Sequence, residues 1–386
     1  MPVQVHLRRD AGRPQIGGSP WIRRKSVRKI LGPPDPGELA AVVDAKGDVV
    51  AHGLYSPDAD LVVRIVEFGT ERPDEDWVER RVAGALARRR ALGLGRDTTG
   101  YREVNSEGDG LPGLTVDRYG DLRVVQLSTA PVVHRRDRIL AALDAAEPRD
   151  ALWIQPESAA RREGFEPVVG GIQPPTLEYT EHGLACSAPA PPGQKTGAYH
   201  DQRENRRWLA DLASRAGGPF LDVGCHVGGF AIHAATRGLV SVGLDASAAA
   251  LDAARRNASL AKVEVSWVKA DMFEPLESPE LRGPFGTIVF DPPRVANSRR
   301  DLPRAVQAMS RACAQLVRRL GPQGLLAICS CSHHLDGFQL DRVAVRAGSI
   351  AGVPLRRVAL LGPGPDHPVA PGHTEGDYLR VAVYQR

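Results

Sequence analysis

The second half of the chain alternates short apolar runs with stretches of helical periodicity. Four apolar runs predict buried strands, at residues 219–223, 240–244, 263–269 and 286–290. Between them, residues 230–236 and 246–260 have the pattern of helices. Strands that alternate with helices are typical of a parallel sheet covered by helices, which binds ligands at the carboxyl ends of its strands. The pattern therefore predicts an α/β domain with its site at that edge.

Glycines and carboxylates stand where these strands end. The first strand contains Asp222 and leads into the turn 224–229, whose glycines let the backbone approach a ligand where a Cβ would collide. The second strand ends at Asp245, about 20 residues past the turn, the spacing at which a carboxylate binds ribose hydroxyls. Asp271 follows the third strand, and Asp291-Pro292-Pro293 follows the fourth. A dinucleotide-binding turn has glycine where this chain has His226, which disfavours a nicotinamide dehydrogenase.

The N-terminal part is β-rich and begins with a basic run. Short strands with tight turns are predicted at residues 39–44, 49–55 and 61–68. An aromatic residue and a group of basic ones precede them, namely Trp21, Arg23, Arg24, Lys25, Arg28 and Lys29. Such a group can hold phosphates and stack a base, which indicates RNA binding. A solvated basic face is the alternative.

A mixed region separates these two parts. Residues 77–94 have a basic helical pattern, residues 122–127 and 151–155 predict strands, and residues 135–146 predict a helix. The proline-rich stretch 189–192 reads as a stiff linker. We therefore predict three domains, at residues 1–75, 76–190 and 191–386.

The composition, the first residues and the cysteines indicate the cellular compartment of the protein. The 386 residues are 42% hydrophobic and 25% charged, and no apolar run approaches the roughly 18 residues that span a bilayer. The first ten residues lack the apolar core of a signal peptide. The five cysteines form no Cys-x-x-Cys pair, which argues against a disulfide framework. We expect a cytoplasmic protein without a membrane partner; the net charge of +4 decides little.

A cysteine follows one further predicted strand. The apolar run 325–328 predicts a buried strand that brings Cys331 to the same sheet edge as Asp291. Free cysteines are usually small buried hydrophobes. Cys329, Cys331 and the two histidines that follow could instead bind a metal, but no second Cys/His cluster supplies clear ligand spacing, so we expect none.

The chemistry of cytosine favours a nucleophile at this position. Carbon 5 of cytosine is a poor nucleophile, but a thiolate that adds to carbon 6 makes the ring enamine-like, so that carbon 5 can take a methyl group. An acid near N3 stabilises the charge that develops. Cys331 as nucleophile and Asp291 as the partner of N3 and N4 meet these demands, and no residue stands out as the base that removes the carbon 5 proton.

The glycine turn, Asp245, Asp271 and Asp291-Pro292-Pro293 together resemble the motif series of class I S-adenosylmethionine-dependent methyltransferases. The resemblance implies that the Asp222 turn faces the methionine part of the cofactor, Asp245 the ribose and Asp271 the adenine. It also implies that the Asp-Pro-Pro turn meets the group to be methylated. The head, with Gly18-Ser19-Pro20-Trp21 near its start, resembles a PUA domain, although relatives commonly have histidine where this chain has Ser19.

Further motifs occur in the order of one family across nearly the whole chain. They resemble the bacterial 23S rRNA 5-methylcytosine methyltransferase I family, and they lie at residues 110–119, 193–197, 201–203, 291–293, 330–334 and 366–368. The resemblance implies an N-terminal PUA-like domain, a small central α+β domain and a C-terminal Rossmann-like methyltransferase sheet. It further implies S-adenosylmethionine as cofactor, S-adenosylhomocysteine as product, ribosomal RNA as partner, Cys331 as nucleophile and, as in many PUA-headed relatives, a homodimer.

We expect the cofactor to be bound by the turn, the strand ends and a glycine-rich segment before residue 202 that could cover it. The expected cofactor-binding residues are Lys195, Tyr199, Asp222, Gly224, Cys225, Gly228, Asp245, Asp271, Asp291 and Pro292.

Two alternatives stay open. Asp-Pro-Pro loops also serve nitrogen acceptors, so the methyl group could go to guanine or to another atom. The fold could also be vestigial, in an RNA-binding factor of ribosome assembly, although the intact acids and Cys331 argue against this. The sequence identifies neither the nucleotide nor whether the substrate is free RNA or an assembled subunit.

Overall fold

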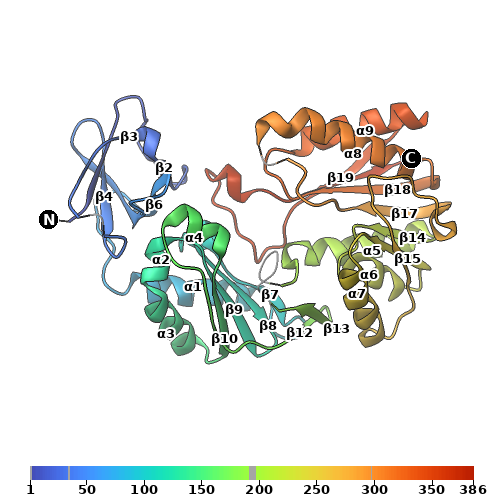
Figure 1. Ribbon diagram of the computed structural model, residues 1–386, viewed down its shortest axis with the longest axis horizontal. Helices are drawn as coiled ribbons and strands as arrows, with labels where there is room; N and C mark the ends of the chain where they lie inside the picture. Colours follow the sequence, from blue (N-terminus) through green and yellow to red (C-terminus); the bar gives the residue numbers. More distant parts are fainter. Residues whose placement is uncertain (1, 34, 191–196, 297) are drawn as a thin grey trace. The chain divides into compact units, whose positions relative to one another are not determined.

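The computed structural model describes residues 2–33, 35–190, 197–296 and 298–386 (Figure 1). These residues form two compact units that do not follow the order of the chain. The first unit holds the described residues of Met1–Leu177, Ala190–Ala198 and Pro365–Gly376, and the second holds Glu178–Pro189, Tyr199–Gly364 and Asp377–Arg386. Among the residues described, none of the helices combines the length and the apolarity needed to cross a bilayer.

The head of the first unit is a six-stranded sheet. Its strands are β1 (Gln4–Leu7), β2 (Trp21–Arg23), β3 (Val27–Leu31), β4 (Leu39–Val43), β5 (Val49–Tyr55) and β6 (Leu61–Phe68), in the order β2-β6-β5-β4-β1-β3. Val5, Val42 and Val62 belong to its core. The three predicted strands are confirmed as β4, β5 and β6. The basic run, predicted only as a charged segment, forms β2, a short 3-10 turn and the edge strand β3.

The rest of the first unit is a five-stranded sheet with helices. The strands are β7 (Gly100–Asn105), β8 (Leu114–Tyr119), β9 (Leu122–Leu127), β10 (Asp150–Gln155) and β11 (Val168–Gly171), in the order β11-β10-β9-β8-β7. The helices are α1 (Trp77–Ala91), α2 (Ala130–His134), α3 (Arg136–Ala146) and α4 (Glu157–Glu163). Val82 of α1 and Ile139 of α3 pack with Val116 and Val125 of the sheet. This is the predicted α+β region.

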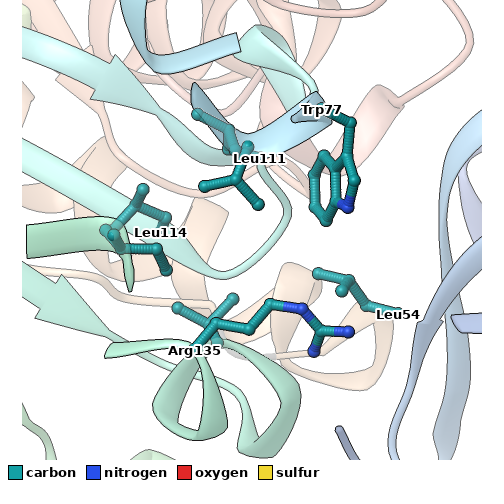
Figure 2. Close-up of a pocket in the computed structure, with 8 residues that line it drawn as sticks. Leu54, Trp77, Leu111, Leu114 and Arg135 are labelled. Carbon is teal, nitrogen blue, oxygen red and sulfur yellow. The ribbon is translucent and has the colours of Figure 1, made fainter. Parts of the chain in front are cut away.

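A small cavity lies where the head meets this region. It measures about 10 Å³ and is lined by apolar side chains that include Leu54, Trp77, Leu111 and Leu114 (Figure 2). The guanidinium of Arg135 also lies beside it and donates to the carbonyl oxygens of residues 36, 37 and 131. A void of this size holds one water molecule at most. We therefore assign it to packing and not to ligand binding.

The second unit contains a seven-stranded sheet. Its strands are β14 (Phe220–Val223), β15 (Ser241–Asp245), β16 (Ser266–Lys269), β17 (Phe285–Phe290), β18 (Leu320–Ser330), β19 (Arg356–Leu361) and β20 (Arg380–Gln385). Their order is β16-β15-β14-β17-β18-β20-β19, and neighbours are parallel except that β20 is antiparallel to β18 and β19. The predicted parallel α/β sheet is confirmed.

Helices cover both faces of this sheet. They are α5 (Arg203–Ala216), α6 (Gly229–Ala235), α7 (Ala248–Leu260), α8 (Leu302–Val317) and α9 (Gly337–Ala351). Figure 1 shows α8 and α9 on one side and α5 to α7 on the other. Because side chains alternate along a strand, Ile288 and Phe290 pack with α8 and α9, whereas Val289 packs with α5 and α6.

The hairpin of β12 (Thr176–Glu181) and β13 (Leu184–Pro189) belongs largely to the second unit, although we assigned it to the central domain. Its anchor is Glu181, which is buried and accepts two hydrogen bonds from Arg206, at 2.7 and 2.6 Å. The Nε2 atom of His233 lies 2.9 Å from the same carboxylate. A buried carboxylate needs such partners, and they lie in the second unit.

The segment Pro365–Gly376 folds with the first unit, although we assigned it to the methyltransferase domain. Asp366 is buried, and its carboxylate accepts the backbone N–H of Arg102 at 2.9 Å. The carbonyl oxygen of Asp366 accepts a hydrogen bond from Arg89 at 2.6 Å. The ring of His373 lies edge-on to Trp21, with ring centroids 4.4 Å apart. These partners lie hundreds of positions away along the chain, so no local pattern could have predicted them.

We predict that the ion pair between Arg64 and Glu163 is a main support of the first unit. Glu163 on α4 accepts from Arg64 of β6 at 2.6 Å and from Ser56 at 2.8 Å, and all three side chains are buried. Glu163→Ala leaves a buried guanidinium unpaired and should lower the free energy of unfolding by about 3 kcal/mol in urea denaturation. Glu157→Ala, at an exposed carboxylate of the same helix, is the control and should change little. Equal effects of the two variants would contradict the prediction.

Candidate methyl-transfer site

The site lies where the order of strands reverses, between β14 and β17. Val223 pairs with Phe290 across these strands, and the N–H of Asp291 donates to the Val223 carbonyl oxygen at 2.9 Å. A Cβ on Gly224 would lie 2.3 Å from the carbonyl oxygen of Asp291, so only glycine fits there. The glycine turn and the Asp-Pro-Pro turn, which are 67 positions apart, therefore meet at the point where open α/β sheets bind ligands.

The glycine turn is held by Asp245. The backbone of His226 has φ 48°, in the left-handed region that costs a non-glycine residue roughly 1–2 kcal/mol. Its N–H donates to Asp245 Oδ2 at 2.9 Å, and the N–H of Ser247 donates to Oδ1 at 2.8 Å. Each carboxylate oxygen has a second lone pair for a ligand hydroxyl. Gly228 completes the turn, because a Cβ there would lie 2.6 Å from the Trp267 ring.

Tyr199 is the predicted cofactor residue that the structure brings to this turn from outside the sheet. Its ring lies edge-on to the ring of His226, with centroids 5.0 Å apart. Lys195, the other predicted residue of that segment, lies outside the described residues.

Asp222 is buried beneath the turn. Its Oδ2 accepts the N–H of Ala231, at the start of α6, at 3.0 Å, while Oδ1 has no hydrogen-bond partner among the described residues. Burial raises the pKa of Asp222 to about 7, against the effect of the Ala231 bond, and the nearby Asp291 carboxylate raises it further. Such a carboxyl group, with one oxygen unbonded, suits a positively charged ligand.

Cys225 lies on the buried side of the turn. Its sulfur would be 3.2 Å from a Cβ placed on Gly243 of β15. Burial raises the pKa of this thiol well above its ordinary value, and the Asp222 and Asp245 carboxylates add to the shift. Burial therefore keeps Cys225 as a neutral thiol beneath the turn, and its assignment to the cofactor side stays a prediction.

Asp271 follows β16 and is exposed. Its Oδ1 accepts the N–H of Phe273 at 2.9 Å, and the Phe273 ring lies edge-on to Phe290 with centroids 6.1 Å apart. Phe273 is 37% exposed, so it presents an aromatic face beside the predicted adenine-binding acid. Sequence reasoning missed this residue; the signal was an aromatic side chain two positions after the acid.

Cys331 reaches the same edge as Asp291, as the strand pattern predicted. Phe290 of β17 pairs with Ile328 of β18, and Asp291 and Cys331 follow these strands. Ser332 Oγ donates to the Ala296 carbonyl oxygen at 2.7 Å, which joins the loop after Asp291 to the loop of Cys331. Cys331 is partly exposed, whereas Cys329 and Cys313 are fully buried and burial raises their pKa values. Within the described residues, no group of three or more His, Cys, Asp or Glu side chains is arranged to hold a metal ion.

The basic run of the head divides into two parts. Trp21 is half-buried, and its indole N–H donates to Glu107 at 2.8 Å, so one edge of the ring is occupied by the protein. Arg23 lies 3.3 Å from Asp60 and 3.6 Å from Glu375, and Arg24 donates to the Ala59 carbonyl oxygen. Lys25, Arg28 and Lys29 are exposed on the 3-10 turn and on β3.

The strand order, the glycine turn and the acids at the strand ends define a class I methyltransferase with a PUA-like head. Two family matches agree: a PUA-like domain over residues 5–68 and a methyltransferase domain over residues 220–315. The chain is 31% identical to "Ribosomal RNA large subunit methyltransferase I" of Tolumonas auensis, over 99% of each chain. It is 34% identical to "Ribosomal RNA large subunit methyltransferase" of Deinococcus radiodurans, over 95% of this chain and 93% of the relative.

The chain therefore belongs to the ribosomal RNA large subunit methyltransferase I family. A solved structure assigned as a SAM-dependent methyltransferase from Streptococcus mutans is 17% identical and covers 100% of both chains with a TM-score of 0.80, which shows the fold. These findings confirm the predicted class and the predicted PUA-like head.

Gly224→Ala tests whether the close approach of the glycine turn to the Asp-Pro-Pro turn is needed to bind the cofactor. The left-handed φ of 86° costs an alanine about 1 kcal/mol, and the added Cβ must also displace the Asp291 carbonyl. We expect affinity for S-adenosylhomocysteine, measured by calorimetry, to fall at least about tenfold. Gly238→Ala is the matched control, because Gly238 has φ 80° but nothing within 4 Å of its Cβ position. If both variants keep full affinity, Gly224 is not needed to bind the cofactor and the prediction is wrong.

A pH dependence of stability follows from Asp222. Because its pKa in the folded protein is about 7, its contribution to stability is fully present below a pH of about 4 and is lost as the pH rises through about 7. Between about pH 5 and pH 8 the free energy of unfolding should fall more for the wild type than for Asp222→Asn, by roughly 1–3 kcal/mol. Urea denaturation measures this, with Asp252→Asn, at an exposed carboxylate of α7, as control. An identical pH dependence of wild type and Asp222→Asn would contradict it.

Proposed function

We propose that this protein forms 5-methylcytosine in large-subunit ribosomal RNA, through a covalent adduct between Cys331 and carbon 6 of the base. The observation that carries the proposal is the joining of the Cys331 loop to the Asp291 loop, through the 2.7 Å hydrogen bond between Ser332 and Ala296. The curated relatives support the substrate class, because they carry the name ribosomal RNA large subunit methyltransferase.

S-adenosylmethionine is the cofactor, and when bound it supplies an electrophilic methyl group. The residues present fit it. Gly224 and Gly228 leave space that a Cβ would fill, and the unbonded oxygen of Asp222 suits a cationic group. In our proposal Asp245 binds the ribose hydroxyls, Asp271 and the ring of Phe273 hold the adenine, and Tyr199 and Pro292 complete the enclosure.

The chain's own residues then account for activation of the base. The Cys331 thiolate forms a bond to carbon 6, and the electron pair of the 5,6 double bond moves into the ring toward N3. Asp291, hydrogen-bonded at N3 and N4, stabilises the charge that develops. Carbon 5 takes the methyl group, and a proton acceptor then removes the carbon 5 proton. The bond between carbon 6 and sulfur breaks at the same time and releases Cys331.

RNA binding is proposed for the head. Exposed Lys25, Arg28 and Lys29 would neutralise phosphates, with contributions from Trp21, Arg23 and Arg24 at the border of the basic run. The target base must be unpaired or flipped to reach Cys331. A homodimer and a cytoplasmic location stay predictions.

Cys331→Ala tests the nucleophile. We expect loss of methyl transfer to ribosomal RNA by at least about 10³-fold with affinity for S-adenosylhomocysteine unchanged, because the sulfur does not serve the cofactor. Transfer is measured with labelled cofactor, followed by mass analysis of nucleosides. Cys186→Ala, at a cysteine of β13 outside the site, is the matched control and should retain activity.

Full activity of Cys331→Ala would overturn the covalent mechanism. A methylguanosine product would instead favour the alternative acceptor. Absence of any S-adenosylmethionine binding by the wild type would favour the vestigial fold.

A further inference from the structure

The segment after the Asp-Pro-Pro turn carries a dense group of basic side chains. Residues 294–304 contain four arginines and one acid, Asp301. The four arginines are exposed, and we call them the arginine patch: Arg294, Arg299, Arg300 and Arg304. Among the residues that the structure describes, none of these guanidinium groups has a carboxylate partner, whereas Arg255 of the same unit pairs with Asp252.

The single acid of this segment offsets at most one of the four charges. Asp301 Oδ2 accepts the backbone N–H and the hydroxyl of Ser298, both at 2.9 Å, in a capping box just before α8. α8 itself contains neither Asp nor Glu. The start of a helix is its positive end, so the arginines gathered there repel one another and the helix dipole. Such an unfavourable arrangement is expected where charges serve a ligand.

The backbone of this segment is anchored on the side of the core. Ala296 is fully buried, and its carbonyl oxygen accepts the Ser332 hydroxyl at 2.7 Å. Val295 and Leu302 pack against the core of the sheet. The arginines between and beside these anchors are exposed. The fold therefore holds the backbone in place and presents the charged side chains to solvent.

The arginine patch lies at the edge of the sheet where the site lies. β17 ends at Phe290, and the segment leads from that end to α8. Arg294 is three positions after Asp291, so their Cα atoms are at most about 11 Å apart. The Ser332 bond also ties the segment to the residue that follows Cys331. A nucleic acid whose base reaches Asp291 thus has its neighbouring phosphates close to these long side chains.

We propose that the arginine patch binds phosphates of the RNA strand next to the target nucleotide. This inference rests on the proposed function, which makes RNA the substrate. A guanidinium group donates pairs of hydrogen bonds to phosphate oxygens. Several exposed guanidinium groups fit the negative charge that repeats along a strand. An acidic protein surface would also attract them, but the position beside Asp291 favours the strand that carries the target base.

The double variant Arg299→Gln with Arg304→Gln tests the patch and leaves the Asp-Pro-Pro turn unchanged. Affinity for unmodified large-subunit ribosomal RNA, transcribed in vitro, should fall about 10- to 30-fold at about 0.1 M salt. The slope of log affinity against log salt should become shallower by about 1.4, because each phosphate contact of a single strand contributes about 0.7. Filter binding between about 50 and 200 mM salt measures both quantities. Unchanged affinity for S-adenosylhomocysteine shows that the variant is folded.

Two further variants separate charge at this place from charge in general. Arg215→Gln with Arg282→Gln is the matched control, because both arginines are exposed and lie before β14 and β17, at the opposite edge of the sheet. This variant loses the same charge and should keep the slope and, within about threefold, the affinity. Arg299→Lys with Arg304→Lys keeps the charge and should keep the wild-type slope.

Wild-type affinity and slope in the Gln variant would overturn the inference and would leave an acidic protein surface as the partner. Equal losses in the matched control, or a Lys variant that loses as much slope as the Gln variant, would overturn it as well. The slope reports on the arginine patch whichever base is methylated, whereas a product other than 5-methylcytidine would overturn the proposed function itself.

Discussion

One backbone hydrogen bond, from the N–H of Asp291 to the carbonyl of Val223, sets the geometry on which the site depends. It brings the ends of β14 and β17 so close that position 224 has no room for a side chain. The turn that follows must then take left-handed backbone angles, even at His226, and the Asp245 carboxylate holds that residue in place. The cofactor side and the base side of the site are thus shaped by the same contact.

Buried polar groups, more than apolar packing, decide which segment belongs to which unit. Glu181 cannot stay buried without Arg206 and His233, so the hairpin that carries it joins the second unit. Asp366 is tied to Arg89 and Arg102 in the same way, so the segment around it joins the first. Such groups are costly when unpaired, and their partners therefore fix the assignment of chain segments more sharply than a hydrophobic face would.

The sequence predicted the parallel strands of the methyltransferase sheet well because their signals are local. Short apolar runs, glycine turns and acids at strand ends repeat with regular spacing, and the placement of Cys331 and Asp291 at one edge of the sheet follows from the parallel strands that precede them. Phe273, which we propose beside the adenine, was not singled out from the sequence, because an aromatic side chain carries no chemical signature until its neighbours are known. The half-buried Trp21 shows the converse: a residue chosen for its chemistry also has a packing role that only Glu107 and His373 reveal.

Because residues 365–376 fold with the first unit, the protein cannot be divided into its two units by simple truncation. The chain leaves the second unit after Gly364, and it returns at Asp377 to supply β20, which pairs with β18, the strand that leads to Cys331. No single cut separates the two units, because a fragment that starts at the methyltransferase region carries a buried acid away from its arginines. Recombination that exchanges whole domains between relatives would face the same obstacle. An exchange of the first unit therefore has to include residues 365–376 as well.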